Sequence, residues 1–139
     1  MNIVAKVAIA VFFVSTGPAV AGKGGFTGSW LIAVSHSLHS NGNYCLKVTD
    51  DGSVGWPHSG FATLTGPGGL NLTFGTFQVI NRIFTVTMEE QGGESGQNAG
   101  LVFSAPARAG GIGAGIYDQV YGGEAFDSGA AEFGAKGGC

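Results

Sequence analysis

The sequence predicts one all-β domain, an antiparallel β-barrel or barrel-like sandwich of about seven or eight strands. Three observations predict it. Of the 139 residues, 44% are hydrophobic and 27 are glycines, and the glycines recur at turn positions. Between these turns lie short runs rich in aromatic and β-branched residues. Within the runs apolar and polar residues alternate with a period of two, and no run shows the 3.6-residue helical period.

The first 21 residues have the three parts of a secretory signal peptide. Met1–Lys6 is a short basic start, Val7–Val14 is an apolar run, and Ala19–Ala21 has a small-x-small cleavage pattern. A membrane anchor is the alternative, but the apolar run is well short of the ~20 residues that span a bilayer. We therefore expect a helical leader over 1–21 and a secreted or periplasmic domain over 22–139 with no membrane span.

The charge distribution argues against nucleic acid and anionic membranes as partners. The six basic residues fall to five when Lys6 leaves with the leader, so nine acidic residues give the mature chain a net charge of −4. The five basic residues are scattered singly, and they form no patch that could neutralise several phosphates. They are Lys23, Lys47, Arg82, Arg108 and Lys136.

The first two predicted strands cover residues 26–35 and 43–50, and each places three apolar side chains on one face. These sets are Trp30, Ile32 and Val34, then Tyr44, Leu46 and Val48. Cys45 alternates with the second set and is therefore expected outside the main core. Asp50–Ser53 predicts a turn rather than a calcium loop, because no run of further oxygen ligands follows.

Export would carry Cys45 and Cys139 to a compartment where disulfides persist. A bond between them would tie down the C-terminus and, on the chain-entropy model, contribute about 4 kcal/mol. A tail lying across the outside of the sheet could reach Cys45 without entering the core. Two free thiols, or an intermolecular bond through Cys139, are the alternatives, and two cysteines alone cannot form a structural zinc site.

The next predicted strand covers 61–65 and ends in a turn at Gly66–Gly69. The apolar set then changes parity between Phe74 and Phe77, so we expect a bulge near Gly75. Three residues before the change are expected to share one face: Leu70, Leu72 and Phe74.

A hairpin is predicted to turn at Asn81–Arg82, although Asn-Arg is a weaker turn signal than Asn-Gly. Its second strand alternates with Phe84, Val86 and Met88 on one face. The polar stretch 89–98 predicts a surface loop. After it, Leu101 and Phe103 share a face of the following strand.

The last strands are predicted around small residues. Pro106 is expected to end a strand or to mark an edge. Residues 110–120 form a further strand whose small residues let another backbone or an aromatic ring approach closely. Gly113–Gly115 is not a dinucleotide fingerprint, because no βαβ unit surrounds it. Residues 125–133 supply one more strand.

Catalytic and metal sites are not indicated. No serine stands in a Gly-x-Ser-x-Gly elbow and the carboxylates fall mostly in loops, so we predict no enzymatic activity and no cofactor. His36, His39 and His58 could bind zinc or copper. Residues 36 and 39 are three apart at a strand end and point to opposite faces, and no carboxylate is near them in sequence. We therefore interpret the three as surface loop histidines.

Asn71-Leu72-Thr73 fits the N-glycosylation sequon, with Asn71 and Thr73 on the solvent side of the alternation. The match matters only in a eukaryotic host. The leader and the sparse disulfides fit a bacterial origin at least as well, so we treat the match as chance.

Ten aromatic residues predict an aromatic-rich interior. They are Trp30, Tyr44, Trp56, Phe61, Phe74, Phe77, Phe84, Phe103, Tyr117 and Tyr121. Core packing is the simpler interpretation, and a cup for a sugar or a flat ligand is the alternative.

The opening strand Phe26-Thr27-Gly28-Ser29-Trp30 resembles the Gly-x-Trp first-strand signature of the calycins, in the Thr-Gly-x-Trp form of the avidins. The resemblance implies an eight-stranded up-and-down barrel, a structural role for Trp30 at the barrel base, and a mouth that binds a small hydrophobic or heterocyclic ligand. Gly-x-Trp followed by Cys45 also resembles small bacterial metalloprotease inhibitors. The later tryptophans of avidins and the second strand cysteine of the inhibitors have no match here.

The function we expect is a non-enzymatic binding module for a small ligand or a carbohydrate. One alternative is a protein-binding barrel, such as a protease inhibitor, that uses an exposed loop or the segment 22–26. Another is a structural protein of the envelope or the extracellular matrix. The interior of the barrel would distinguish these functions. An open mouth favours small-ligand binding, whereas a packed core favours a function on the outer surface.

Overall fold

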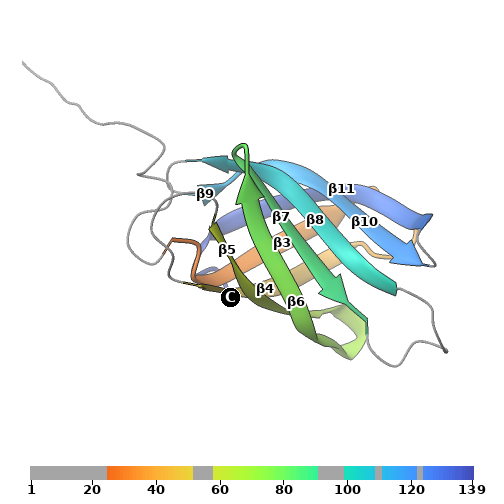
Figure 1. Cartoon of the computed structure of the whole chain (residues 1–139). Helices are drawn as coiled ribbons and strands as arrows, with labels where there is room; N and C mark the ends of the chain where they lie inside the picture. Colours follow the sequence, from red (N-terminus) through yellow and green to blue (C-terminus); the bar gives the residue numbers. More distant parts are fainter. Residues whose placement is uncertain (1–24, 52–57, 91–98, 109–110, 122–123) are drawn as a thin grey trace, which may run out of the picture.

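The computed structural model describes residues 25–51, 58–90, 99–108, 111–121 and 124–139 (Figure 1). Within them the strands are β3 Gly28–Ser35, β4 Gly42–Asp50, β5 His58–Gly66, β6 Leu70–Ile80, β7 Ile83–Glu89, β8 Ala99–Arg108, β9 Gly111–Ile112, β10 Ala114–Tyr121 and β11 Glu124–Lys136. A 3₁₀ turn, Pro67–Gly69, joins β5 to β6. The predicted leader over 1–21, Trp56 and most of the predicted loop 89–98 lie outside the described residues.

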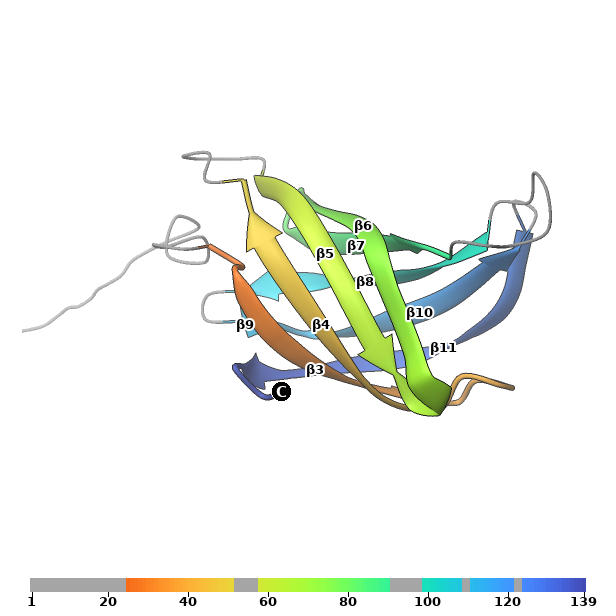
Figure 2. The same cartoon turned by 90° about the horizontal axis from the view of Figure 1, so that it is seen from below.

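The described strands form a closed antiparallel barrel of eight strands. Consecutive strands pair from β3 to β8, β10 pairs with both β8 and β11, and β11 returns to β3. The two-residue β9 is a short extension that pairs with the end of β8. Figures 1 and 2 show the strands wrapping around a common interior. The predicted barrel is confirmed over the sandwich, because the β8–β10 and β11–β3 pairings leave no open sheet edge.

Alternation along the strands builds the core as predicted for the first two strands. All six of their predicted inward side chains are buried, and Leu46 and Ile32 are fully inaccessible. Phe84, Val86 and Met88 of β7 and Leu101 and Phe103 of β8 are buried as well. Residues of opposite parity in these strands lie on the outer wall of the barrel.

A chain of contacting aromatic rings runs through the interior of the barrel. The rings of Phe26, Phe84, Phe133, Phe103 and Tyr117 contact in that order, with centroids between 5.2 and 6.4 Å apart. Phe26 lies just before β3 at one end of the barrel, whereas Tyr117 reaches the β3–β4 loop at the other. We call this set the aromatic column, and it packs the barrel axis with edge-to-face and tilted contacts.

Three of the ten predicted interior aromatics are on the outside. Phe61 is 69% exposed, Phe74 is 54% exposed and Tyr121 is 47% exposed. Phe61 falls on the outward parity of β5, beside the buried Ala62. Tyr121 ends β10 at the rim of the barrel, beyond the packed interior.

The predicted bulge near Gly75 is present and explains the position of Phe74. Ala62 of β5 pairs with Gly75, but Leu64 pairs with Leu72, so β6 carries one extra residue between the two pairs. The extra residue changes the inward–outward alternation before Phe74 instead of after it, so the Phe74 side chain faces outward. The expected shared face for Leu70, Leu72 and Phe74 is therefore wrong for Phe74.

Both predicted turns around β6 are confirmed. Gly68 and Gly69 adopt φ of +71° and +78° in the turn before the strand, a region that suits glycine. After the strand, Asn81 and Arg82 have φ of +53° and +63°. Positive φ at both central residues is the type I′ hairpin geometry.

The β8–β10 seam shows why small residues and a proline lie here. A Cβ on Gly115 would clash with the Ser104 carbonyl oxygen and the Ala105 Cα, so the predicted close approach is confirmed. The expectation that Pro106 ends a strand is wrong, since β8 continues to Arg108. The β8–β10 ladder stops at the Ile116–Ser104 pair, so Pro106 lies beyond it and its missing N–H costs that ladder nothing.

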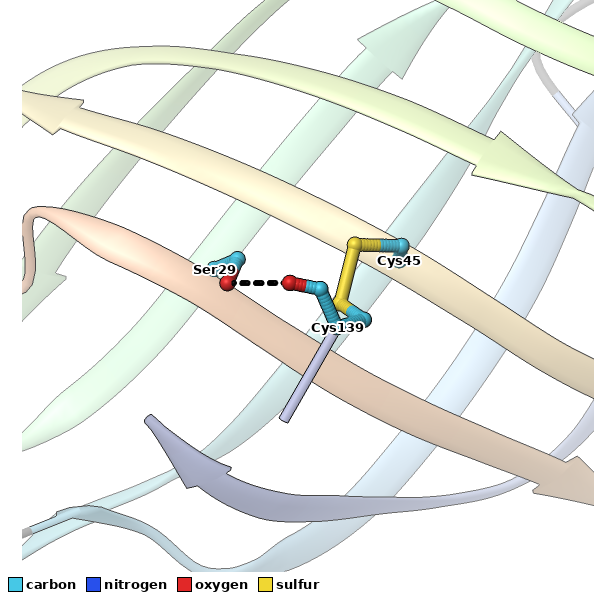
Figure 3. Close-up of a disulfide and its surroundings, with 3 residues drawn as sticks. All are labelled: Ser29, Cys45 and Cys139. Carbon is cyan, nitrogen blue, oxygen red and sulfur yellow. Dashed lines mark hydrogen bonds between the residues drawn. A yellow bond between two sulfur atoms is a disulfide. The ribbon is translucent and has the colours of Figure 1, made fainter. Parts of the chain in front are cut away.

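The predicted disulfide joins Cys45 to Cys139, and it lies outside the core as expected. The tail crosses the outer side of β3 to reach β4 (Figure 3). Ser29 holds it there, because its carbonyl accepts from Gly137 N–H at 2.7 Å and its hydroxyl donates to the Cys139 carbonyl at 2.9 Å. A disulfide is typical of proteins outside the reducing cytosol. In the described part of the chain no helix is long and apolar enough to cross a bilayer.

Candidate functional site

Strands β5, β6 and β7 form a hollow on the outer wall of the barrel. Its volume is about 380 Å³. The residues that line it are Asp51, Ser59, Gly60, Phe61, Thr76, Phe77, Gln78, Thr85 and Thr87. We call it the outer-wall hollow.

Strand register brings these side chains together. Phe61 of β5 lies opposite Thr76 of β6, and Thr76 lies opposite Thr87 of β7. One step along, Gln78 is flanked by its two partners Ser59 and Thr85. Directly paired side chains on one face of an antiparallel sheet are neighbours, so two parallel rows cross the three strands.

The floor of the hollow depends on Gly60. A Cβ there would clash with the Thr49 carbonyl oxygen and lie 2.7 Å from the Phe77 ring. Glycine therefore lets β4, β5 and the Phe77 ring meet closely beneath the hollow. Phe61 stands above this floor with its ring largely in solvent.

The polar groups of the hollow are mostly unused by the protein itself. Ser59 Oγ donates to Asp51 Oδ2 at 2.8 Å, and Thr85 Oγ1 lies 3.4 Å from Ser104 Oγ. The side chains of Thr76, Thr87 and Gln78 have no hydrogen-bond partner among the described residues. Asp51 is the one charged group among the described lining residues. The described lining thus offers hydroxyl and amide groups to a ligand, and it includes no cationic group.

A second polar cluster lies at the end of the barrel where β3 turns into β4. Asp127 of β11 is 5% exposed and accepts hydrogen bonds from Leu38 N–H at 2.9 Å and His39 N–H at 3.0 Å. The Ser40 hydroxyl donates to the same carboxylate at 3.0 Å. We call this the Asp127 clamp, because it holds the β3–β4 loop against β11.

Two tyrosines extend the Asp127 clamp into the core. The Tyr117 hydroxyl donates to Ser40 Oγ at 2.8 Å, and the Tyr44 hydroxyl donates to the Ser40 carbonyl at 2.7 Å. The hydrogen bond from Leu38 N–H makes the largest contribution to a lowered pKa of Asp127, and the other donors add to it. Together they outweigh the effect of burial, which raises the pKa. Burial raises the pKa of Tyr117 to about 12. At neutral pH the carboxylate is ionised and both phenols are protonated, so the cluster serves as a fixed hydrogen-bond network.

Exposed apolar side chains lie next to the residues of the Asp127 clamp. Leu38 is 80% exposed and Phe126 is 60% exposed. The His39 ring stacks on Phe126 at 6.2 Å, and Tyr121 lies 6.5 Å from the same ring.

The three histidines do not meet. His36 and His39 are exposed as interpreted, whereas His58 is buried in β5 and its Nδ1 lies 2.9 Å from Asp50 Oδ2. Its interpretation as a surface histidine is wrong, because His58 has inward parity and packs edge-on against the Phe26 ring. No group of three metal-ligating side chains occurs among the residues that the structure describes.

Neither polar region was predicted from the sequence. Asp127 shares the inward parity of Ala131 and Phe133, so a carboxylate on a core face was the available signal. Phe61 shares the outward parity of Thr63 and Thr65 in its strand, which marks it as exposed. In the sequon, Asn71 and Thr73 are both on the outer wall as expected.

Trp30 lies in the core with 1% exposure. Its Nε1–H donates to the Phe26 carbonyl at 3.0 Å, and the Lys136 ammonium lies 5.8 Å from its ring centroid. The closed barrel of eight strands is consistent with the architecture that the calycin resemblance implies. No family model, curated protein or solved structure matches this chain.

Proposed function

We propose that this protein is a secreted or periplasmic, non-enzymatic binding module that holds a small ligand on the outer wall of its barrel. The outer-wall hollow carries this proposal. It combines an exposed ring, Phe61, with side chains such as Thr76 and Gln78 that leave their hydrogen-bonding groups unused. A concave site with an apolar contact and a few convergent polar groups is typical of small-molecule recognition.

The buried aromatic column supports an outer site over an inner one. In calycins the ligand enters the mouth of the barrel, where an open interior receives it. Here the aromatic column occupies the axis, and Tyr117 and Tyr44 close one end through Ser40. We infer that the resemblance to calycins concerns the barrel and Trp30 rather than the place of binding.

The hydrogen-bond networks favour binding over catalysis. The Asp127 carboxylate already accepts three hydrogen bonds from the β3–β4 loop, and burial holds the tyrosine pKa values above their ordinary value. A general base needs a free lone pair within reach of a substrate proton. The Asp127 clamp therefore has a structural role in this proposal.

Amide chemical shifts of the exported, oxidised protein would test the binding site. We expect ligands from a small-molecule library to shift the amides of Thr76, Gln78, Thr85 and Thr87. Ligands that instead shift Phe103 and Tyr117 would place the site inside the barrel and contradict the proposal. A library without any ligand would favour a structural protein of the envelope or matrix.

One observation favours a protein-binding role as the second candidate. Leu38 projects from a loop whose backbone is fixed by Asp127 and Asn41, and Asn41 Oδ1 accepts from Ser37 N–H at 2.9 Å. A rigid loop with one exposed apolar side chain loses little entropy when a partner covers it.

A substrate-like inhibitor loop does not fit this geometry. Leu38 and His39 both direct their N–H groups to the Asp127 carboxylate, so the chain turns around it and cannot lie extended in a protease cleft. We expect no inhibition of metalloproteases or serine proteases by the intact protein. Inhibition that Leu38→Ala abolishes would replace the small-ligand proposal with this second candidate.

A further inference from the structure

We infer that the outer-wall hollow recognises a neutral saccharide, with the Phe61 ring as the platform for one face of a sugar. The inference rests on the proposed function, because it names the ligand class for the same site. Three properties of the described residues carry it: the setting of the ring, the type of polar group around it, and the distribution of charge.

The ring of Phe61 is open to a flat ligand. It stands in a cross-strand row between Thr49 of β4 and Thr76 of β6, and both threonines are exposed. These short neighbours leave the ring 69% exposed. A sugar ring has one face of C–H groups, which packs on an aromatic ring as other apolar surfaces do.

The polar groups match a ligand whose edge consists of hydroxyls. The hydroxyls of Thr76 and Thr87 can each donate and accept a hydrogen bond. The Gln78 amide supplies an NH₂ donor and a carbonyl acceptor. A purely apolar ligand would bury these groups without hydrogen-bond partners, which makes its binding less favourable.

Charge excludes the anionic ligand classes. The described lining contains no Lys, Arg or His. Phosphates, sulfates and uronic acids would enter a site without a compensating cation, and ionic groups are costly to desolvate unpaired. The volume of about 380 Å³ lies at the lower end of small-molecule sites, which suits about one or two sugar rings.

Affinity electrophoresis of the exported protein would test the inference. The gels contain neutral soluble polysaccharides (β-1,3-glucan, mixed-linkage β-glucan, xylan, mannan and an α-glucan) or the anionic polymers alginate and heparin. We expect at least one neutral polymer and neither anionic polymer to slow the wild-type protein. Phe61→Ala should weaken that binding roughly tenfold, since it removes the platform. Thr87→Val, which removes one hydroxyl at nearly constant volume, should weaken it several-fold.

Phe74→Ala is the matched control. Phe74 is also an exposed phenylalanine of the neighbouring strand, but it lies outside the lining of the hollow. We expect this variant to bind as the wild type does. Equal losses in Phe61→Ala and Phe74→Ala would overturn the inference, because they would indicate general apolar adhesion.

Two further outcomes would overturn the inference and separate it from the proposed function. If no neutral polymer slows the protein while a non-carbohydrate ligand shifts the amides of Thr76 and Thr87, the site is a binding site but its ligand is not a saccharide. If neither polymers nor small molecules act at these residues, the inference and the proposed function both fail.

Discussion

The outer-wall hollow and the Asp127 clamp use similar side chains for different purposes. Both combine hydroxyls, a carboxylate and aromatic rings. In the Asp127 clamp Ser40 and Asp127 donate and accept within the protein, and the tyrosines around them are buried. In the outer-wall hollow Thr76, Thr87 and Gln78 keep their groups for solvent, and Phe61 is exposed. A structural cluster therefore differs from a binding surface in whether its hydrogen-bonding groups are paired within the protein, and not in its residue types.

The largest expected effect on stability is that of Asp127→Ala. The change removes the acceptor for Leu38 N–H, His39 N–H and the Ser40 hydroxyl together. Donors left without an acceptor make the folded state less favourable. We expect a marked fall in the denaturation midpoint and fast hydrogen exchange at Leu38 and His39. Glu132→Ala, an exposed carboxylate of the same strand, is the control, and equal midpoints for the two variants would remove the structural role of the Asp127 clamp.

Acid should weaken the same cluster in a predictable direction. The pKa of Asp127 is lower in the folded protein than its unfolded value of about 3.9, so unfolding takes up a proton in acid. The contribution of Asp127 is present above the unfolded pKa and is lost as the pH falls through the folded pKa. Urea midpoints between about pH 7 and about pH 2 would measure this loss. Asp127→Asn should have a flatter profile than the wild type, whereas identical profiles would contradict the assignment.

Removal of one hydroxyl from the Asp127 clamp should have a smaller effect. Tyr117→Phe deletes the donor to Ser40 Oγ and should lower the free energy of unfolding by about 1 kcal/mol. Tyr121→Phe removes an exposed hydroxyl of the same strand and should change it little. Chemical denaturation of both variants would measure the difference. An unchanged free energy of unfolding in Tyr117→Phe would show that this hydrogen bond contributes nothing to stability.

Changes in the outer-wall hollow should have the smallest effect on stability. Phe61→Ala and Phe74→Ala remove exposed rings, so each should change the free energy of unfolding by no more than about 0.5 kcal/mol. Ligand binding should nevertheless fall in the first variant alone. A large loss of stability in Phe61→Ala would show that its ring supports the fold, and the contrast between the two regions would disappear.

Short-range alternation accounts for the parts of the fold that could be predicted. Trp30, Ile32 and Val34 must share a face once the segment is a strand, because side chains alternate along it. The outward position of Cys45 follows from the same alternation, as does the route of the tail to Cys139. Prediction failed where one residue changes the parity, as the extra residue in β6 does at Phe74.

By itself, the sequence determined the all-β class, the turns around β6 and the pairing of the two cysteines, since these depend on local alternation, on turn chemistry and on two cysteines with one mutual partner. The choice of a closed barrel over a sandwich came from the β8–β10 and β11–β3 pairings. Tertiary structure decided which polar groups are satisfied. Asp127 accepts from Leu38 across a separation of 89 residues, and Phe61 and Thr87 line the same hollow only through the register of three strands. The physical reason is that alternation assigns a side chain to a face of its own strand, whereas its neighbours on that face come from strand pairings that no local pattern specifies.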